Sequence, residues 1–237
     1  EEFGEWLGEV RGETHVILSE HRPIPLYQHI LINSSLIDLF SSPGKVNPEI
    51  LAAEREAMRK VKIPRHRREQ WGASDPRLSR PEIIEKLQRE NLLPAITFIF
   101  SRMGCDAAVK QCLAAGIELT NTEERAEILK TAERYTANLP EEDLEVLGYR
   151  DWITALERGI AAHHAGLLPS FKNAIEDLFQ RGLVKAVFAT ETLALGINMP
   201  ARTVVLEKLT KWNGEAHVPI TPGEYTQLTG RAGRRGI

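Results

Sequence analysis

Hydrophobic positions follow a regular pattern from residue 81 onward. Short apolar runs alternate with longer stretches of helical character. Short runs of this kind predict buried strands between helices. The predicted strands are Ala95–Phe100, Ile160–His163, Val184–Ala189 and Thr203–Leu206. The predicted helices are Pro81–Glu90, Gly104–Ala115, a helix that starts at Asn121, Pro140–Leu147, Asp151–Glu157 and Ser170–Arg181.

The order of these elements predicts the fold. Asn121 with Glu124 three residues later has the form of a capping box, and Gly159 and Gly182 are suited to end the helices before them. Strands that alternate with helices predict a parallel sheet with helices on both faces. Ligands of such α/β folds bind at the carboxyl ends of the strands, so the loops there are the first candidates for chemistry.

The first 80 residues follow a different pattern. Two apolar runs, His15–Leu18 and His29–Ile32, flank a proline-containing stretch that favours an extended linker. Residues 41–80 are basic and poor in apolar side chains, which predicts an insertion with one helix and poorly ordered flanks. The basic run Arg55–Arg68 is interleaved with glutamates, so it is either a solvated helix or a contact for RNA or a partner.

Composition limits the classes of function. The 237 residues carry a formal net charge of -3, so any site for a polyanion must be a local patch. Cys105 and Cys112 lie about two helical turns apart, too far for a disulfide, and are expected to be reduced core thiols. No membrane span or signal peptide is evident, and we expect a cytoplasmic protein with no membrane partner. Because the chain opens on Glu1 and stops within a motif, we expect it to be part of a longer protein.

Four loops are unusually polar or glycine-rich for connections in a structural sheet. Three follow predicted strands and read "FSRMGC", "HHAGLLP" and "ATETLALGINMP". The fourth, "QLTGRAGRR", comes after the last strand. If this segment is helical from Gln227 to Arg234, then Gln227, Arg231 and Arg234 share one face, within about 60° of one another. Arginine forks suit a phosphate, whereas the alternative is a solvated basic terminus.

The motifs around these loops resemble those of a known family. The segments "PAITFIFSRMGCD", "GIAAHHAGLLPSFKNAIEDLFQRGLVKAVFATETLALGINMPARTVV" and "PGEYTQLTGRAGRRG" are similar to motifs IV, IVa, V and VI of superfamily 2 helicases. Among these the chain resembles the Ski-like DExH-box RNA helicases, and especially the actinobacterial HelY-type members. The similarity covers roughly residues 93–237, together with "EEFGEWL" and "HRPIPLYQHIL".

The resemblance implies a function and a role for each matching residue. It implies the second RecA-like domain of an ATP-dependent RNA helicase, in which motif VI reaches across a cleft to ATP. Arg231 and Arg234 then act as arginine fingers beside Gln227, because charge spreads over the phosphoryl oxygens in the transition state. The residues that the resemblance places at the nucleotide are Glu191, Gly196 and Asn198. Those that it places at the nucleic-acid strand are Ser101, Arg102, His163, His164, Gly166 and Thr190.

The sequence also departs from a complete helicase. It contains no G-x-x-x-x-G-K-[ST] and no DExH motif, so the groups that hold ATP and Mg²⁺ are expected on a first RecA-like domain outside this chain. We therefore expect an α/β RecA-like domain without its own P-loop, inactive when isolated. The expected divisions are the end of the first domain and a linker over 1–40, the insertion over 41–80, and the second domain over 81–237, truncated at motif VI.

Two features have more than one interpretation. His163 and His164 could be structural, could contact nucleic acid, or could bind a metal, but neighbours on a strand point to opposite faces and no third ligand is close in sequence. Trp212 either seals a hairpin against the core or stacks on a base, and the first is expected.

Three functions remain open at this stage. Beside the helicase half, the chain could be a stand-alone binding module for nucleic acid or protein, or a phosphatase that uses Arg231, Arg234 and His164 but lacks a nucleophile near them. The expected partners are single-stranded RNA, with DNA as an alternative, the first RecA-like domain, and an RNA-degrading complex. Backbone contacts carry little base information, so the choice between RNA and DNA depends on contacts to the 2′-hydroxyl.

Overall fold

A four-stranded parallel sheet forms the centre of the computed structural model, which describes residues 2–12, 15, 24–32, 34–60, 78–194 and 199–233. The strands lie in the order β6-β7-β5-β8. Their bounds are Ala95–Phe98 for β5, Ile160–His163 for β6, Ala186–Ala189 for β7 and Thr203–Leu206 for β8. Each of these strands was predicted, and their parallel pairing confirms the predicted α/β fold.

The strands end at the same level of the sheet. Ala189 of β7 pairs with Phe98 of β5 on one side and with His163 of β6 on the other. Phe98 in turn pairs with Leu206, the last residue of β8. The loops that leave β5, β6 and β7 therefore start side by side, and we call this side of the sheet the carboxyl edge.

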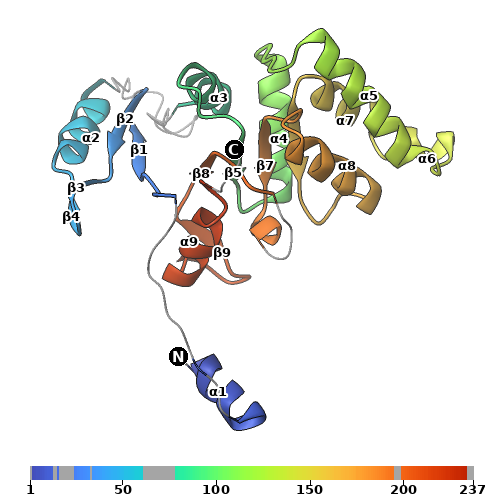
Figure 1. Ribbon diagram of the computed structural model, residues 1–237. Helices are drawn as coiled ribbons and strands as arrows, with labels where there is room; N and C mark the ends of the chain where they lie inside the picture. The colour runs from blue at the N-terminus through green and yellow to red at the C-terminus, as the bar shows by residue number, and fades with distance from the viewer. Residues whose placement is uncertain are drawn as a thin grey trace.

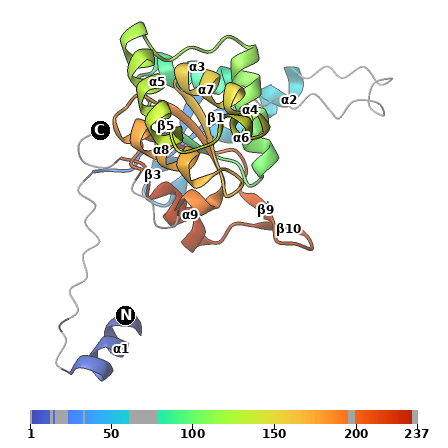
Figure 2. The same cartoon turned by 90° about the vertical axis from the view of Figure 1, so that its right-hand side faces the viewer.

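Helices cover both faces of the sheet, as Figures 1 and 2 show. Alternate strand residues enter two separate cores: Ile96 packs in a cluster with Leu178 of α8, while Ala95 packs in a cluster with Cys105 of α4. This alternation is the expected geometry of a strand buried on both faces. The helices of this part are α3 (Arg80–Arg89), α4 (Arg102–Ala114), α5 (Thr122–Thr136), α6 (Glu141–Val146), α7 (Tyr149–Glu157) and α8 (Pro169–Gln180).

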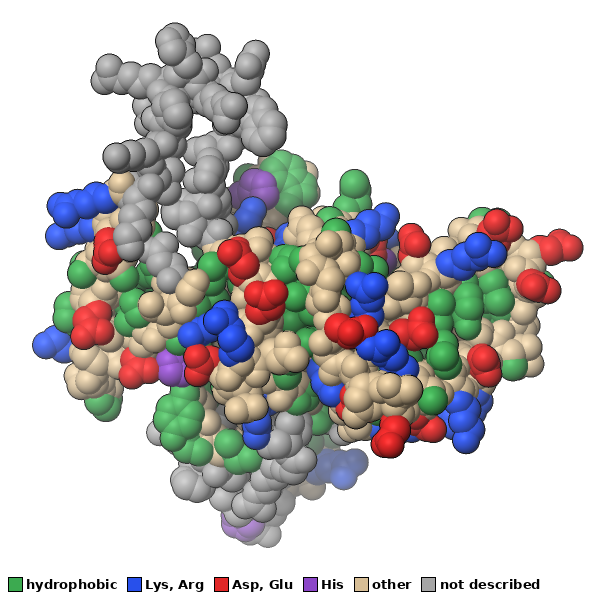
Figure 3. Space-filling view, turned by 90° about the horizontal axis from the view of Figure 1, so that it is seen from above, with side chains coloured by type: hydrophobic (Ala, Val, Ile, Leu, Met, Phe, Trp, Pro, Cys, Tyr) green, Lys and Arg blue, Asp and Glu red, His purple; other side chains and the backbone are tan. Residues whose placement is uncertain are grey.

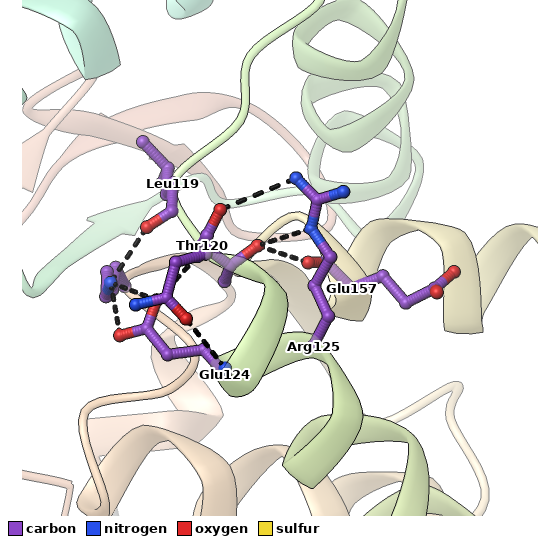
Figure 4. A network of polar contacts seen from close by, with 7 residues as sticks. Leu119, Thr120, Glu124, Arg125 and Glu157 are labelled. Atoms are coloured by element: carbon purple, nitrogen blue, oxygen red, sulfur yellow. Dashed lines mark hydrogen bonds and ion pairs between the residues drawn. The ribbon is translucent and has the colours of Figure 1, made fainter.

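The start of α5 is held by a polar network (Figure 4). Asn121 and Glu124 form the predicted capping box, with the Glu124 amide donating to the Asn121 side chain at 2.8 Å. The ammonium of Lys185 donates to the Leu119 carbonyl at 2.8 Å and to the Glu124 carboxylate at 2.7 Å. The Thr120 hydroxyl donates to the Glu157 carbonyl at the end of α7. These contacts join α5, α7 and the approach to β7.

The two glycines that were expected to end helices do so. Gly159 follows α7 with φ of 76°, and Gly182 follows α8 with φ of 72°. This left-handed conformation is accessible to glycine at little cost, whereas a Cβ carbon introduces strain. At Gly159 a Cβ would also lie 3.0 Å from a Thr120 methyl carbon, so both conformation and space favour glycine.

The N-terminal part contains more structure than its sequence predicted. The expected helix of the insertion is α2 (Glu49–Lys60), and the apolar run His29–Ile32 forms β1. Three further strands, β2 (Ser35–Asp38), β3 (Phe40–Ser42) and β4 (Lys45–Val46), and the helix α1 (Glu2–Arg11) were not predicted. Residues 61–77 and most of His15–Leu18 lie outside the described residues, and so does the expected flank after the insertion helix. The flank before that helix, 41–48, was expected to be poorly ordered, but it contains the end of β3 and all of β4.

A long-range hydrogen bond connects this part to the C-terminal helix. The Tyr225 hydroxyl on α9 (Pro222–Thr229) donates to the side-chain oxygen of Gln28, next to β1, at 2.5 Å. These two residues lie 197 positions apart in the sequence. A hairpin of β9 (Thr210–Trp212) and β10 (His217–Pro219) precedes α9.

Cys105 and Cys112 are both free and buried in α4, as expected. Burial disfavours the thiolate and raises the pKa of each thiol to about 12. Both therefore act as apolar core residues, and neither is a reactive thiol. In the portion of the chain that the structure describes, no helix is long and apolar enough to cross a membrane.

Candidate functional site

The β5–α4 connection places Arg102 at the carboxyl edge. Ser101 caps α4, accepting a hydrogen bond from the Gly104 amide at 3.2 Å. Gly104 is required there, because a Cβ would lie 2.7 Å from a methyl carbon of Ile99. Arg102 is the first residue of α4 and is exposed at this edge. Both Ser101 and Arg102 were expected to contact the nucleic-acid strand.

The β6–α8 connection carries the two adjacent histidines. His163 is 3% exposed and its Nε2 lies 2.9 Å from a Glu176 carboxylate oxygen on α8. His164 is 5% exposed and its Nε2 lies 3.0 Å from an Asp106 oxygen on α4. The two side chains thus reach opposite helices. Both are tied to carboxylates within the fold, which favours a structural role for the rings over direct contact with a strand.

Burial also sets the protonation of His163. Desolvation lowers the pKa of its imidazole, and the nearby Glu176 carboxylate only partly opposes this effect. Within the described residues no group of three or more His, Cys, Asp or Glu side chains could hold a metal ion. The pair Asp106 and Glu176 was not anticipated from the sequence, because each lies on a helix far from the histidines along the chain.

The β7 connection joins the same edge. Thr190 lies next to β6, where its amide donates to the His163 carbonyl at 3.3 Å. Its hydroxyl lies 3.0 Å from the hydroxyl of Thr192, in the 3-10 turn η2 (Glu191–Ala194). Glu191 is exposed and forms an ion pair with Lys211 of β9 at 3.0 Å. The loops after β5, β6 and β7 are therefore brought together as the sequence predicted.

A cavity of about 340 Å³ opens at this edge. Its lining includes Lys172 and Asn173 on the first turn of α8, neither of which the sequence reasoning singled out. The sequence signal that could have identified them is their position three and four residues after Pro169, the residue that begins the helix after the histidine loop. The cavity is lined by His163, His164, Ala165, Pro169, Lys172, Asn173, Glu176 and Thr192.

The condition that one helix runs from Gln227 to Arg234 is not met. Helix α9 ends at Thr229, and residues 230–233 form a turn that we call the arginine turn. Gln227 is exposed on the helix, whereas Arg231 is only 8% exposed, so the two do not share a face. The physical reason is a bridge outside the helix: Ala232 pairs with Ala201, and Gly233 adopts φ of 63°, which a helix does not allow.

The arginine turn does not belong to the carboxyl edge either. The Ala201 amide donates to the Arg231 carbonyl at 3.0 Å, and Ala201 lies just before the amino end of β8. The backbone of Arg231 therefore lies at the other end of the sheet from His164, which argues against a phosphatase site built from both. Arg234, Gly196 and Asn198 lie outside the described residues.

The hairpin before α9 connects the two regions. Lys211 binds Glu191 in η2 and Glu224 in the first turn of α9. The hydrogen bond from Lys211 and the capping contacts of Thr221 lower the pKa of Glu224 to about 2.

Trp212 lies in the expected hairpin but is 56% exposed, edge-on to His217, so it does not seal the core. Stacking on a base, the alternative interpretation, is compatible with this exposure.

Charge is dispersed over the surface shown in Figure 3, where acidic and basic side chains are interspersed. This matches the net charge of -3 and leaves a nucleic-acid strand to be bound by a few local contacts. On α2, Arg55 and Arg59 are exposed, which agrees with a solvated helix over that part of the basic run.

Comparison with known proteins agrees with the arrangement of these loops. The family described as the helicase conserved C-terminal domain matches residues 111–236. "Probable helicase HelY" of Mycobacterium leprae is 56% identical over all of this chain and 27% of its own length. The "DExH-box ATP-dependent RNA helicase DExH15 chloroplastic" of Arabidopsis thaliana is 38% identical over the whole chain and 22% of its own length.

A human relative extends the comparison. "Superkiller complex protein 2" is 36% identical over all of this chain and 20% of its own length. The chain spans about a quarter of the length of these curated relatives. A family match over more than half of the residues, in the region that holds the loops after β6 and β7 and the arginine turn, shows that the chain belongs to the helicase conserved C-terminal domain family and is of the Ski-like, HelY type.

Proposed function

We propose that this chain supplies the second RecA-like half of an ATP-dependent RNA helicase. The observation that carries the proposal is the convergence of three loops at the carboxyl edge, where Arg102 lies beside Gly166 and the Thr190 amide bonds to the His163 carbonyl. Hydroxyls, one exposed arginine and a glycine without a side chain along a sheet edge suit a phosphate backbone better than a base edge. In the proposed groove Ser101 is a further contact. The buried rings of His163 and His164 would hold the loop in place without touching the strand.

The arginine turn serves the nucleotide in this proposal. Arg231 and Arg234 would contact the ATP phosphates across the cleft to a first RecA-like domain, with Gln227 beside them. Gly196 and Asn198, which lie between the carboxyl edge and Ala201 in the sequence, would face the same nucleotide. Glu191, at the carboxyl edge, would lie on the far side of that site from Arg231. The burial of Arg231 supports this role, since a guanidinium in a low-dielectric site stabilises developing phosphoryl charge more strongly than an exposed one.

ATP and Mg²⁺ would bind mainly to the first RecA-like domain. The sequence of this chain contains neither the P-loop nor the acidic DExH motif that hold them. Residues 1–40 would then be the end of that first domain and the linker, 41–80 the insertion, and 81–237 the second domain. The name of the Arabidopsis relative supports RNA as the strand, and the name of the human relative supports a complex as a partner. In our proposal that complex degrades RNA.

The absent P-loop also favours one alternative, a stand-alone binding module without catalysis. ATPase assays separate the two. The chain alone should not hydrolyse ATP, whereas the same chain joined to the first RecA-like domain of the full protein should do so in the presence of RNA. Turnover by the chain alone that survives Arg231→Ala would contradict the proposal. Failure of the full protein to hydrolyse ATP with RNA or DNA would favour the binding module.

A further inference from the structure

The two histidines after β6 differ in one contact. Both are buried and both bind a carboxylate through Nε2. Only His164 has a described partner for its second ring nitrogen, since the Gly166 amide donates to Nδ1 at 3.1 Å. Asp106, His164 and Gly166 thus form a continuous chain of hydrogen bonds, which we call the Asp106 relay. It starts on α4 and ends in the β6–α8 loop.

The relay selects one form of the imidazole ring. An ionised carboxylate only accepts hydrogen bonds, so Nε2 of His164 must carry the proton that faces Asp106. A backbone amide only donates, so Nδ1 must keep its lone pair toward Gly166. The neutral ring with its proton on Nε2 satisfies both neighbours. Asp106 therefore favours the tautomer that the loop amide requires.

The relay also places Gly166 against Arg102. A Cβ on Gly166 would lie 3.1 Å from Nδ1 of His164 and 3.7 Å from Cδ of Arg102, so the bare side of this glycine faces both side chains. Arg102 and Asp106 are four residues apart on α4 and lie on the same side of that helix. One helix thus carries both the exposed arginine and the carboxylate that holds the neighbouring loop.

We propose that Asp106 and His164 are positioning residues, which set the β6–α8 loop so that Gly166 and Arg102 contact the same stretch of single-stranded nucleic acid. This inference rests on the proposed function of the carboxyl edge. Neither residue needs to touch the strand. Asp106 is half exposed, with 50% of its side chain accessible, so its replacement changes the loop more than the core.

Substitutions of His164 can separate the two ends of the relay. The amide of asparagine lies near the place of Nδ1 and offers an oxygen to the Gly166 amide, whereas the amide of glutamine lies near Nε2 and reaches Asp106 only. We expect His164→Gln and Asp106→Ala to weaken binding of a fluorescent single-stranded RNA about tenfold, the scale of one buried hydrogen bond left unmade. His164→Asn keeps an acceptor for the Gly166 amide, and Asp106→Asn keeps an acceptor for the His164 ring. The affinity of both variants for the RNA should stay within about twofold of that of the unaltered chain.

Exchange of the Gly166 amide, followed by NMR on the whole chain, tests the relay independently of binding. The amide should be protected in the unaltered chain, in His164→Asn and in Asp106→Asn, and should exchange at least about tenfold faster in the other two variants. Asp177→Asn serves as the control and should change neither measurement. Asp177 lies on α8, away from the relay, and its carboxylate forms an ion pair with Arg134 of α5.

The outcomes separate the inference from the function. Equal behaviour of His164→Asn and His164→Gln in both measurements would overturn the relay, even if the chain binds RNA. Affinity losses that merely follow the melting temperatures of the variants would also overturn it. If the unaltered chain binds no strand, the proposed function of the carboxyl edge fails, and the exchange of the Gly166 amide still decides whether the relay holds the loop.

Discussion

The carboxyl edge and the arginine turn are two candidate binding regions built in different ways. At the carboxyl edge each loop directly follows a buried strand, and the loops are joined by contacts such as the hydrogen bond from the Thr190 amide to the His163 carbonyl. The arginine turn follows a short helix, and its conformation depends on the bridge between Ala232 and Ala201, a residue distant in the sequence. The first region is set by the sheet itself, and the second by a contact that only the folded domain supplies.

This difference separates the two proposed tasks. Arg102 is exposed and close to a surface loop, which suits a weak contact that moves along a phosphate backbone. Arg231 is buried, which suits a single strong contact with a fixed geometry. Substitutions in one region should therefore leave the function of the other largely intact, and the following experiments test this.

The largest effect is expected at the arginine turn. In the full protein, Arg231→Lys or Arg234→Ala should lower kcat for RNA-stimulated ATP hydrolysis by on the order of 10³-fold, because arginine-finger contacts contribute mainly in the transition state. The affinity for RNA should change much less. Arg202→Lys is the matched control, because Arg202 is exposed near the same bridge and its guanidinium donates to the Asn91 carbonyl at 2.7 Å. Near-normal turnover in both arginine variants would show that the turn does not serve ATP.

A smaller effect is expected at the carboxyl edge. The chain should bind single strands with micromolar or weaker affinity, and Arg102→Ala should lower this affinity similarly for every sequence while reducing the slope of log K against log salt by about one. Titration of labelled strands at several salt concentrations measures both quantities. Arg59→Ala on α2 is the control, and binding that is lost there but kept in Arg102→Ala would move the groove to the basic insertion.

The smallest effect concerns the backbone of the arginine turn. Gly233→Ala forces a Cβ into φ of 63° and should lower the free energy of unfolding by about 1 kcal/mol, measured by urea titration. Gly116→Ala is a matched control, because Gly116 has φ of 74° and open space around it. Both variants should lose similar stability, but only Gly233→Ala should also slow ATP hydrolysis by the full protein. Equal turnover in the two would mean that the turn does not place the arginines.

The sheet and most of its helices could be predicted because their signals are local. The ends of the four predicted strands lie within two residues of the observed ends. The predicted strand Val184–Ala189 began two residues too early, because the Val184 amide bonds to the Leu178 carbonyl in the turn after α8. The hairpin of β3 and β4 escaped prediction because its side chains are exposed and carry no alternating apolar pattern.

The parts of the candidate site that depend on local signals could be predicted, and those that depend on distant contacts could not. Loops that follow strands were placed at one edge correctly, whereas the end of α9 was not, because nothing near Gly230 in the sequence shows that Ala232 pairs with Ala201. Asp106 and Glu176 were missed for a related reason. A carboxylate on an amphipathic helix looks solvent-facing until the fold brings a buried histidine beside it.

The hydrogen bond between Tyr225 and Gln28 has a consequence for the order of folding. Closing a chain segment of 197 residues costs about 5 kcal/mol of entropy, whereas one hydrogen bond returns only about 1 kcal/mol. The contact therefore cannot bring α9 and the start of β1 together by itself. It forms once the sheet has already positioned α9, so residues 24–28 attach late, after the local helices and the parallel strand pairs of the central sheet have formed.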